Sequence, residues 1–197
     1  MVELSSIDKD ASILYTINKE KKAKQYTEPI SMRDGGTVTA WFANNPSIKS
    51  SVTFKKLETI QTEVIYASSE EVDDGDAKNL VDGDPTTYWH SMYSVTVAKY
   101  PHWVDLDAGE VKTIKGFTYM PRQDSYNGNI KEYSIHVSMD GKNWGEPVQK
   151  GTFAGNRDEK KVIFSQPVKG RYIRFTALSE QYGQDYASGA ELTILAE

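Results

Sequence analysis

The sequence contains no cysteine among its 197 residues. This absence excludes a disulfide scaffold, a thiolate zinc site and a cysteine nucleophile, but it does not fix the compartment, because a large enough core needs no disulfides. No apolar run approaches the roughly 20 residues of a membrane-spanning helix. The first residues, Met-Val-Glu-Leu-Ser-Ser, lack the basic and apolar regions of a signal peptide. We therefore expect either a cytoplasmic protein or a part of a longer chain.

Basic residues are too few for a protein that binds polyanions. The 23 Lys and Arg residues are outnumbered by 28 Asp and Glu residues, which gives a formal net charge of -5. Nucleic acids and anionic membrane surfaces need a basic footprint, so we expect neither as a partner. The 38% of hydrophobic residues is typical of a globular protein.

Charge divides the chain near residue 63. Residues 1–63 carry a net charge of +1, whereas residues 64–197 carry -6. Seven of the acidic residues lie between Glu70 and Asp84. We interpret the first of them, from Glu70 to Asp76, as a solvated acidic loop.

Apolar residues alternate with polar ones along most of the chain, which is the period of a β-strand. Residues 13–17, 37–42 and 51–54 read as three short strands of a small sandwich. The alternation recurs at Val104 and Leu106, from Tyr133 to Met139, from Ile173 to Ala177, and at Leu192 and Ile194. Only residues 19–25 and 76–81 tolerate a short helix. The pattern predicts an all-β protein whose second part is a sandwich or barrel.

Seven motifs in the second part occur in the order and spacing of a known family. They are NLVDGDPTTYWH at 79–90, PHWVDLDAG at 101–109, YMPRQD at 119–124, NGNIKEY at 127–133, SMDGKNW at 138–144, RYIRF at 171–175 and GAEL at 189–192. This series resembles the discoidin domain, also called the coagulation factor five/eight C-type domain, and within it the bacterial family-32 carbohydrate-binding modules. The resemblance implies a galactose-binding-like β-sandwich jelly roll over residues 64–197, usually appended to a secreted glycoside hydrolase and without catalysis of its own.

The first part resembles a different domain. The segments ILYT at 13–16, YTEPI at 26–30 and GTVTA at 36–40 resemble the small immunoglobulin-like β domain near the C-terminus of bacterial chitobiases and hexosaminidases. The sequence departs from that pattern after Thr16, where Ile17-Asn18-Lys19-Glu20 stands in place of an Asp-Gly turn. The resemblance implies a spacer domain over residues 1–63.

One acidic loop has the character of a calcium site. Calcium takes about six to eight oxygen ligands, so its sites combine carboxylates and carbonyls on a loop that glycine allows to turn sharply. The segment from Asp82 to Thr87 contains such residues. The resemblance implies a structural Ca²⁺ held by the carbonyl of Asn79, by Asp82, Asp84 and Thr87, by the carbonyl of Ala190 and by the carboxylate of Glu191. The alternative is an Asp-Gly turn with solvated charges and no ion.

Sugars are recognised by planar donors and acceptors and by an aromatic face that covers the apolar side of the ring. The resemblance implies that His90, Arg122 and Asn127 are the polar trio and that Tyr93 is the aromatic platform. Tyr182 is our candidate for a second wall. Arg122 would donate a fork of hydrogen bonds, and His90 would contact the axial hydroxyl that distinguishes galactose from glucose. We therefore expect galactose-type ligands, including N-acetylgalactosamine.

Each of these residues also has a purely structural explanation. A His beside a Trp is common at a strand edge, Arg122 has an acid nearby in Asp124, and Asn127-Gly128 is an ordinary turn former. His102 is a rival for the role of His90. The tryptophans are interpreted as core or rim packing: Trp41, Trp89, Trp103 and Trp144.

Other functional classes are less well supported. The sequence has no Gly-x-Ser-x-Gly, His-Glu-x-x-His or Gly-rich phosphate motif, so a catalytic centre would need paired carboxylates that turns and the metal loop already explain. Membrane insertion would need exposed apolar spikes beside basic residues, and residues 91–99 offer only one Lys. The remaining alternative is a spacer or adhesion module without sugar binding.

The sequence therefore predicts a non-catalytic, glycan-binding accessory region of a bacterial glycoside hydrolase. Its partners would be a terminal galactose-type sugar and a catalytic domain in the parent chain, of the chitobiase, hexosaminidase, fucosidase or galactosidase type. Its expected location is secreted, periplasmic or at the cell surface.

Overall fold

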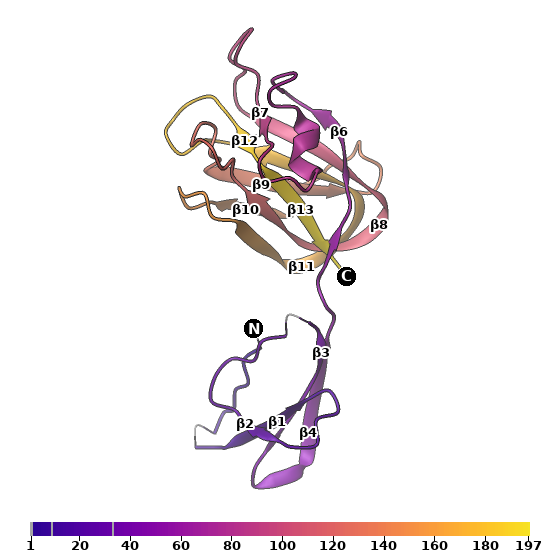
Figure 1. The fold of residues 1–197 in the computed structure, drawn as a ribbon. Coiled ribbons are helices and arrows are strands. Elements are labelled where there is room, and N and C mark those ends of the chain that lie inside the picture. Colours follow the sequence, from indigo (N-terminus) through magenta and orange to yellow (C-terminus); the bar gives the residue numbers. More distant parts are fainter. Residues whose placement is uncertain (1, 9, 33) are drawn as a thin grey trace. The chain divides into compact units, whose positions relative to one another are not determined.

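The computed structural model describes residues 2–8, 10–32 and 34–197. Backbone contacts divide the chain into two compact units, of which the first ends at Leu57 and the second begins at Glu58 (Figure 1). The sequence placed this division at residues 63 and 64. The difference arises because β5 (Glu58–Ile60) pairs with β13 (Glu191–Ala196), the last strand of the second unit.

The first unit is built on one antiparallel sheet with the order β2-β1-β3-β4. Its strands are β1 (Ile13–Ile17), β2 (Lys24–Gln25), β3 (Gly36–Phe42) and β4 (Asn45–Phe54). The three predicted strands are confirmed. Residues 19–25, which tolerate a helix, instead end in the edge strand β2, because this charged segment has no apolar face to bury.

A second sheet does not occur among the described residues of this unit. The pairing outside the main sheet is a single bridge between Val2 and Ile30, and Ile30 is 5% exposed. Val38, in the middle of β3, is 3% exposed. The resemblance of this unit to an immunoglobulin-like sandwich therefore stays a prediction.

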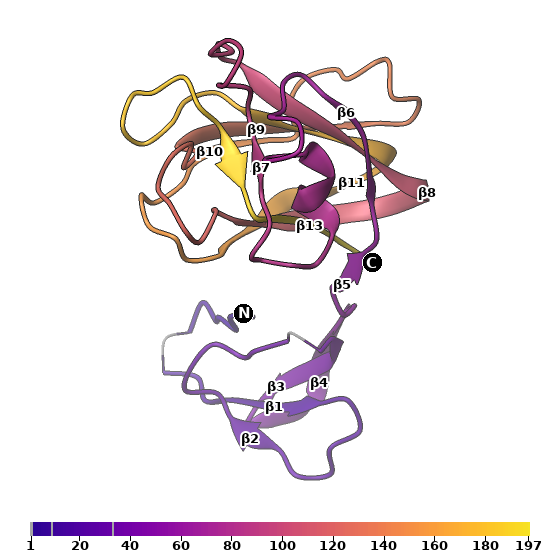
Figure 2. The ribbon, with the colours of Figure 1, turned by 45° about the horizontal axis from the view of Figure 1, so that its top comes forward.

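The second unit is an all-β domain with one short 3₁₀ turn, η1 (Ala77–Val81) (Figure 2). Its main sheet has the order β10-β9-β11-β8-β13-β5, and β6 also pairs with β8. The strands are β6 (Glu63–Ala67), β7 (Trp89–His90), β8 (His102–Met120), β9 (Glu132–Ser138), β10 (Gln149–Thr152), β11 (Lys160–Ala177), β12 (Ser188–Gly189) and β13. No described helix has the length and apolar character needed to cross a membrane.

The two longest strands fold this sheet into two layers. Residues 102–107 of β8 pair with 172–177 of β11, whereas residues 112–119 pair with 160–170. Register shifts in β11 and a positive φ of 76° at Gly109 mark the bend between these halves. Strands that change layers at such a corner produce a sandwich whose two inner faces pack together. Figures 1 and 2 follow β8 and β11 through the bend.

Aromatic rings from both layers fill the space between them. Phe117, in the second half of β8, contacts Tyr133 on β9 at 5.5 Å and Phe175 on β11 at 5.9 Å between ring centroids. Tyr119 stacks on Phe153 at 5.0 Å and is completely buried. This core confirms the predicted all-β jelly-roll class.

Arg174 organises the outer face of one layer. Its guanidinium lies 5.3 Å from the ring centroid of Trp103 and 4.3 Å from that of Trp144. It also donates two hydrogen bonds, of 2.6 and 2.7 Å, to the carboxylate of Asp105, whose side chain is 8% exposed. The two tryptophans therefore pack on a paired cation at the rim of the fold, as their interpretation as packing residues predicts.

Replacing Arg174 should destabilise the second unit. In Arg174→Ala the buried carboxylate of Asp105 loses its partner, so we expect the free energy of unfolding to fall by about 2–4 kcal/mol. Denaturant unfolding followed by tryptophan fluorescence measures this. Arg171→Ala is the matched control, because Arg171 makes the same forked pair with Asp107 at a more exposed position. An equal loss in both variants would contradict the role given to the buried pair and its two rings.

Candidate functional site

A short two-stranded ribbon lies at one end of the second unit and carries one of the predicted sugar-binding residues, His90. In this ribbon Ser188 pairs with His90 and Gly189 pairs with Trp89. The backbone of His90 is also fixed on its other side, because its N–H donates to the carbonyl of Gly75 at 3.0 Å. A Cβ atom on Gly75 would lie 2.7 Å from the Cβ of His90, so only glycine allows this approach. His90 is consequently 3% exposed.

Three aromatic rings meet at His90. The imidazole lies 4.9 Å from the ring of Tyr93 and 5.5 Å from that of Tyr186, and the two tyrosine rings are 6.4 Å apart. Tyr93 is 40% exposed, so part of its ring faces solvent beside the buried imidazole. The sequence predicted His90 and Tyr93 but missed Tyr186. The available signal was the position of Tyr186 two residues before the strand that pairs with His90.

The acidic loop before this cluster positions the predicted platform. Glu71 is 7% exposed and accepts hydrogen bonds from the N–H groups of Tyr93 at 2.7 Å and Ser94 at 2.9 Å, and from the Ser94 hydroxyl. The Ser94 hydroxyl and these N–H groups lower the pKa of Glu71. The interpretation of residues 70–76 as a solvated loop is therefore wrong for Glu71, because its carboxylate satisfies the donors of the loop that carries Tyr93.

The Tyr93 ring is held at its far end as well. Its hydroxyl donates to the carboxylate of Asp74 at 2.6 Å. This hydrogen bond raises the pKa of Tyr93 to about 12. The platform is thus fixed at its backbone by Glu71 and at its hydroxyl by Asp74, and both acids come from one turn.

Arg122 lies near the imidazole but already has partners. Its guanidinium stacks on the Tyr88 ring at 3.6 Å and donates hydrogen bonds of 2.8 and 2.7 Å to Asp124. The structural explanation offered by the sequence, a pair with Asp124, therefore occurs. Nη1 and the second proton of Nη2 lie outside this pair. Burial lowers the pKa of His90, and the positive charge of Arg122 lowers it further.

Asn127 is tied to the ribbon through its backbone, whereas Tyr182 contacts a different ring. The carbonyl of Asn127 accepts a hydrogen bond of 2.7 Å from the hydroxyl of Ser188, the residue that pairs with His90. The Asn127 side chain is exposed. Tyr182 is 59% exposed, and its ring meets Tyr126 at 6.2 Å. The structure thus gathers His90, Tyr93 and Arg122 with Asn127 nearby, and it places Tyr182 in a separate aromatic pair.

The loop from Asp82 to Thr87 faces Glu191 across the fold. Thr87 donates to Asp82 at 2.8 Å, and the N–H of Asp84 donates to the same carboxylate at 2.8 Å. Burial and the neighbouring charge of Asp82 raise the pKa of Glu191 to about 7. Its Oε1 atom is buried without a hydrogen-bond partner.

These oxygens fit a hard cation only when backbone carbonyls contribute. Among residues 2–8, 10–32 and 34–197, no group of three or more His, Asp or Glu side chains forms a metal site by itself. The predicted set contains two carbonyls, those of Asn79 and Ala190, and Ala190 is completely buried. A cation near Glu191 would both partner its orphaned oxygen and relieve its repulsion by Asp82.

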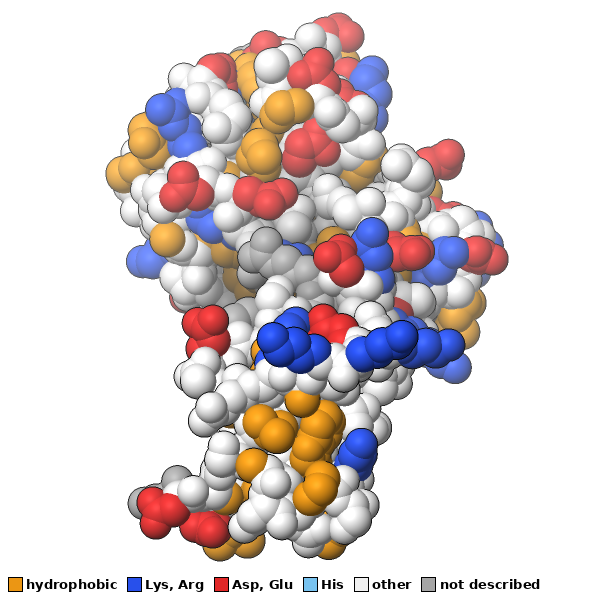
Figure 3. All heavy atoms as spheres, turned by 60° about the horizontal axis from the view of Figure 1, so that its bottom comes forward, with side chains coloured by type: hydrophobic (Ala, Val, Ile, Leu, Met, Phe, Trp, Pro, Cys, Tyr) orange, Lys and Arg blue, Asp and Glu red, His pale blue; other side chains and the backbone are white. Residues whose placement is uncertain are grey.

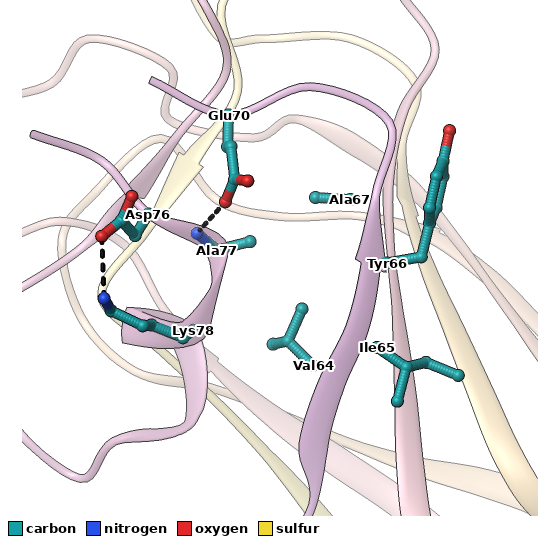
Figure 4. Close-up of a pocket in the computed structure, with 8 residues that line it drawn as sticks. All are labelled: Val64, Ile65, Tyr66, Ala67, Glu70, Asp76, Ala77 and Lys78. Carbon is teal, nitrogen blue, oxygen red and sulfur yellow. Dashed lines mark hydrogen bonds and ion pairs between the residues drawn. The ribbon is translucent and has the colours of Figure 1, made fainter. Parts of the chain in front are cut away.

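Two other features of the described residues, a cavity and an apolar face, do not contain the predicted site residues. One, of about 330 Å³, lies between β6 and η1 and is lined in part by Val64, Tyr66 and Ala77 (Figure 4). The polar groups at its rim bond to one another, as Lys78 does to Asp76 at 3.0 Å. On the first unit, apolar side chains gather on one face (Figure 3). Neither feature brings together a polar set aimed at a ligand.

The second unit is thus a jelly-roll sandwich whose buried polar and exposed aromatic side chains converge on the loops at one end. The chain belongs to the F5/8 type C domain family, whose model matches residues 64–192. A sialidase of Micromonospora viridifaciens is 38% identical over 172 residues. That alignment covers 85% of this chain, so it extends beyond the second unit into the first, but it covers only 26% of the sialidase.

Solved structures with the same fold include family-32 carbohydrate-binding modules. The Clostridium perfringens module CpGH89CBM32-5, in complex with GalNAc-β-1,3-galactose, has a TM-score of 0.64 and 31% identity, and the match covers 70% of this chain and 99% of that one. The family-32 module of C. perfringens NanJ, in complex with galactose, has a TM-score of 0.63 and 27% identity, and the match covers 71% of this chain and 98% of that one. The predicted family and jelly-roll fold of the second unit are therefore confirmed.

The environment of His90 predicts its titration. Protonation would place an imidazolium in a buried position beside Arg122, so we expect His90 to titrate below 6.5, the value of an unperturbed imidazole. The unfolded chain would take up this proton first, so the contribution of His90 to stability falls as the pH drops below 6.5. An NMR pH titration, with His90→Gln to assign the resonance, measures the pKa. A value at or above 6.5 would contradict the buried, neutral state.

Proposed function

We propose that this chain binds carbohydrate, with a terminal galactose-type sugar as the ligand of the second unit. The observation that carries the proposal is a buried imidazole packed against an exposed tyrosine ring, with a guanidinium close by. The proposed ligand-binding residues are His90, Tyr93, Arg122 and Asn127. Tyr186 joins them as a wall of the same cluster, because its ring contacts both His90 and Tyr93.

The chemistry of His90 suits a sugar hydroxyl. Its Nδ1 lies 2.7 Å from the carbonyl of Ser91, so a neutral ring carries its proton there and leaves Nε2 as an acceptor. A hydroxyl of the sugar would donate to Nε2 while Arg122 N–H groups outside the pair with Asp124 donate to a neighbouring oxygen. Tyr93 would cover the apolar side of the ring. A charged imidazole would lose the acceptor, so the depressed pKa of His90 supports this role.

The solved relatives support galactose-type ligands. Two family-32 modules similar to this chain have been solved with galactose or with GalNAc-β-1,3-galactose. A shallow site formed by loops buries little of a monosaccharide, so binding to one sugar would be weak and would gain strength from several sites on one glycan surface.

The proposed setting is a non-catalytic accessory region of a bacterial glycoside hydrolase, secreted, periplasmic or at the cell surface. The first unit would be a spacer of the chitobiase C-terminal type, and the second would hold a catalytic domain of the parent chain near its glycan. The sialidase relative, of which this chain matches about a quarter, is consistent with such a setting. The alternative is a spacer or adhesion module that binds no sugar.

Substitution at the cluster should weaken sugar binding. We expect His90→Ala and Arg122→Ala each to weaken binding of terminal galactose glycans by about tenfold or more, because each removes a directional hydrogen bond from a small site. A glycan array followed by calorimetry with methyl galactoside measures this. His136→Ala is the matched control, since that histidine lies on β9 and bonds to the Gly145 carbonyl. Silence of the wild type across the array would favour the spacer or adhesion alternative.

We also propose that a structural Ca²⁺ binds where the loop from Asp82 to Thr87 meets Glu191. The residues that would hold it are the carbonyl of Asn79, Asp82, Asp84, Thr87, the carbonyl of Ala190 and Glu191. The orphaned oxygen and raised pKa of Glu191 support this proposal, because a bound cation would partner that oxygen and favour the charged carboxylate. The ion would stabilise the fold and would take no part in chemistry.

Calcium should therefore stabilise the second unit. We expect millimolar Ca²⁺ to raise the melting temperature by about 5–10 °C relative to EDTA, since an ion that binds only the folded state adds to its stability. Differential scanning calorimetry measures the shift. In Glu191→Gln the shift should disappear, whereas in Glu146→Gln, which removes an exposed charge elsewhere, it should persist. A wild-type melting temperature indifferent to both Ca²⁺ and EDTA would refute the metal site.

A further inference from the structure

A second aromatic corner lies beside the proposed sugar site. The rings of Tyr126 and Tyr182 meet edge to face at 6.2 Å and 87°, and they are 43% and 59% exposed. The guanidinium of Arg157 lies over the Tyr126 ring at 4.8 Å. Tyr126 directly precedes Asn127, so this corner and the proposed galactose site are adjacent along the same loop.

Hydrogen bonds fix the three loops that form this corner. Gln123 donates to the carbonyl of Arg157 at 3.0 Å, and Arg157 Nη1 donates back to the carbonyl of Gln123. Gln181, the neighbour of Tyr182, donates to the carbonyl of Phe153 at 3.0 Å. The loops that carry the rings are therefore tied together, and the Arg157 guanidinium is fixed by a backbone carbonyl, before any ligand arrives, which reduces the entropy lost on binding.

The charge of Arg157 is not neutralised by a carboxylate. Among the described residues, no acid forms an ion pair with it, although the chain as a whole is acidic. Two of the nearby acids have other partners. Asp124 accepts the fork of Arg122, and Asp158 accepts a hydrogen bond of 2.7 Å from the side chain of Asn156. A guanidinium that stacks on one ring and keeps free N–H groups is suited to a planar anion.

We propose that Tyr126, Tyr182 and Arg157 form a subsite for an acidic sugar linked to the galactose-type residue. The exposed face of Tyr182 receives the apolar side of the second ring. Arg157 pairs with the carboxylate of that ring, and the Tyr126 ring holds the guanidinium in place. This inference rests on the proposed function, since the subsite extends the galactose site past Asn127. It assigns the chain to acidic glycans in preference to neutral ones.

Two disaccharides that differ by one group test the subsite. Lactose and β-galactosyl-1,4-glucuronic acid share a terminal galactose, and the second ring carries a hydroxymethyl group in one and a carboxylate in the other. We expect wild-type protein to bind the acidic disaccharide about three- to tenfold more tightly at low salt, because one charge-assisted pair forms at a partly exposed site. The advantage should shrink as the ionic strength rises. Isothermal titration calorimetry measures both affinities.

Variants separate the charge of Arg157 from its geometry. In Arg157→Gln the acidic disaccharide should lose its advantage over lactose, and in Arg157→Lys, which keeps the charge without the planar fork, part of the advantage should remain. Lys142→Gln removes one exposed positive charge on a distant turn and should leave the ratio unchanged. Thermal unfolding of each variant checks that the loops still fold.

The outcomes distinguish this inference from the function on which it rests. The acidic subsite would be overturned by equal wild-type affinities for the two disaccharides, or by a preference for the acidic one that survives Arg157→Gln. In that case, weaker binding of both disaccharides by His90→Ala would still support the galactose site. Failure to bind lactose or methyl galactoside would overturn the proposed function instead. If the acidic disaccharide alone bound, through Arg157 and independently of His90, the anionic subsite would stand without its galactose neighbour.

Discussion

The pairing of residues 188–189 with residues 89–90 is the contact on which the loop end of the second unit depends. It brings Ser188 against His90, and the same serine reaches the carbonyl of Asn127. Three loops distant in sequence are thereby joined through backbone and hydroxyl groups. The side chains proposed to contact sugar take no part in these junction contacts. They could therefore be substituted without breaking the pairing of the loops.

Three acidic residues near that junction position other protein groups and are not proposed to contact the sugar. Glu71 holds the loop of Tyr93, Asp74 holds its hydroxyl, and Asp124 holds Arg122. A site that must present a donor or a ring to a weakly bound sugar gains from such restraint, because less conformational entropy is lost when the ligand arrives. These carboxylates therefore stabilise order within the protein. Among the arginines of the second unit, all of which the structure describes, Arg122, Arg171 and Arg174 each pair with an aspartate, and Arg157 does not.

The sequence was sufficient for the fold because alternation and turn motifs are local signals. The strands around Val104, Ile135 and Ile173 lie where the pattern places them, and the family motifs fix their order. The details that sequence reasoning missed or placed differently depend on contacts between distant residues. The unit boundary depends on the pairing of β5 with β13, and the burial of Glu71 depends on donors 22 and 23 residues later. Tyr186 is distinguished from Tyr182 only by the contact of its ring with His90. None of these contacts leaves a period or a motif in the chain.

The bend in β8 and β11 couples the two layers of the second unit during unfolding. Since each strand contributes hydrogen bonds to both layers, neither layer can detach while the other remains intact. Unfolding of this unit is therefore expected to be all-or-none, without a populated state in which one sheet survives. The amides of both layers would exchange with solvent through the same rare global opening. A domain that unfolds in this way exposes its core strands to proteases only during that rare global opening.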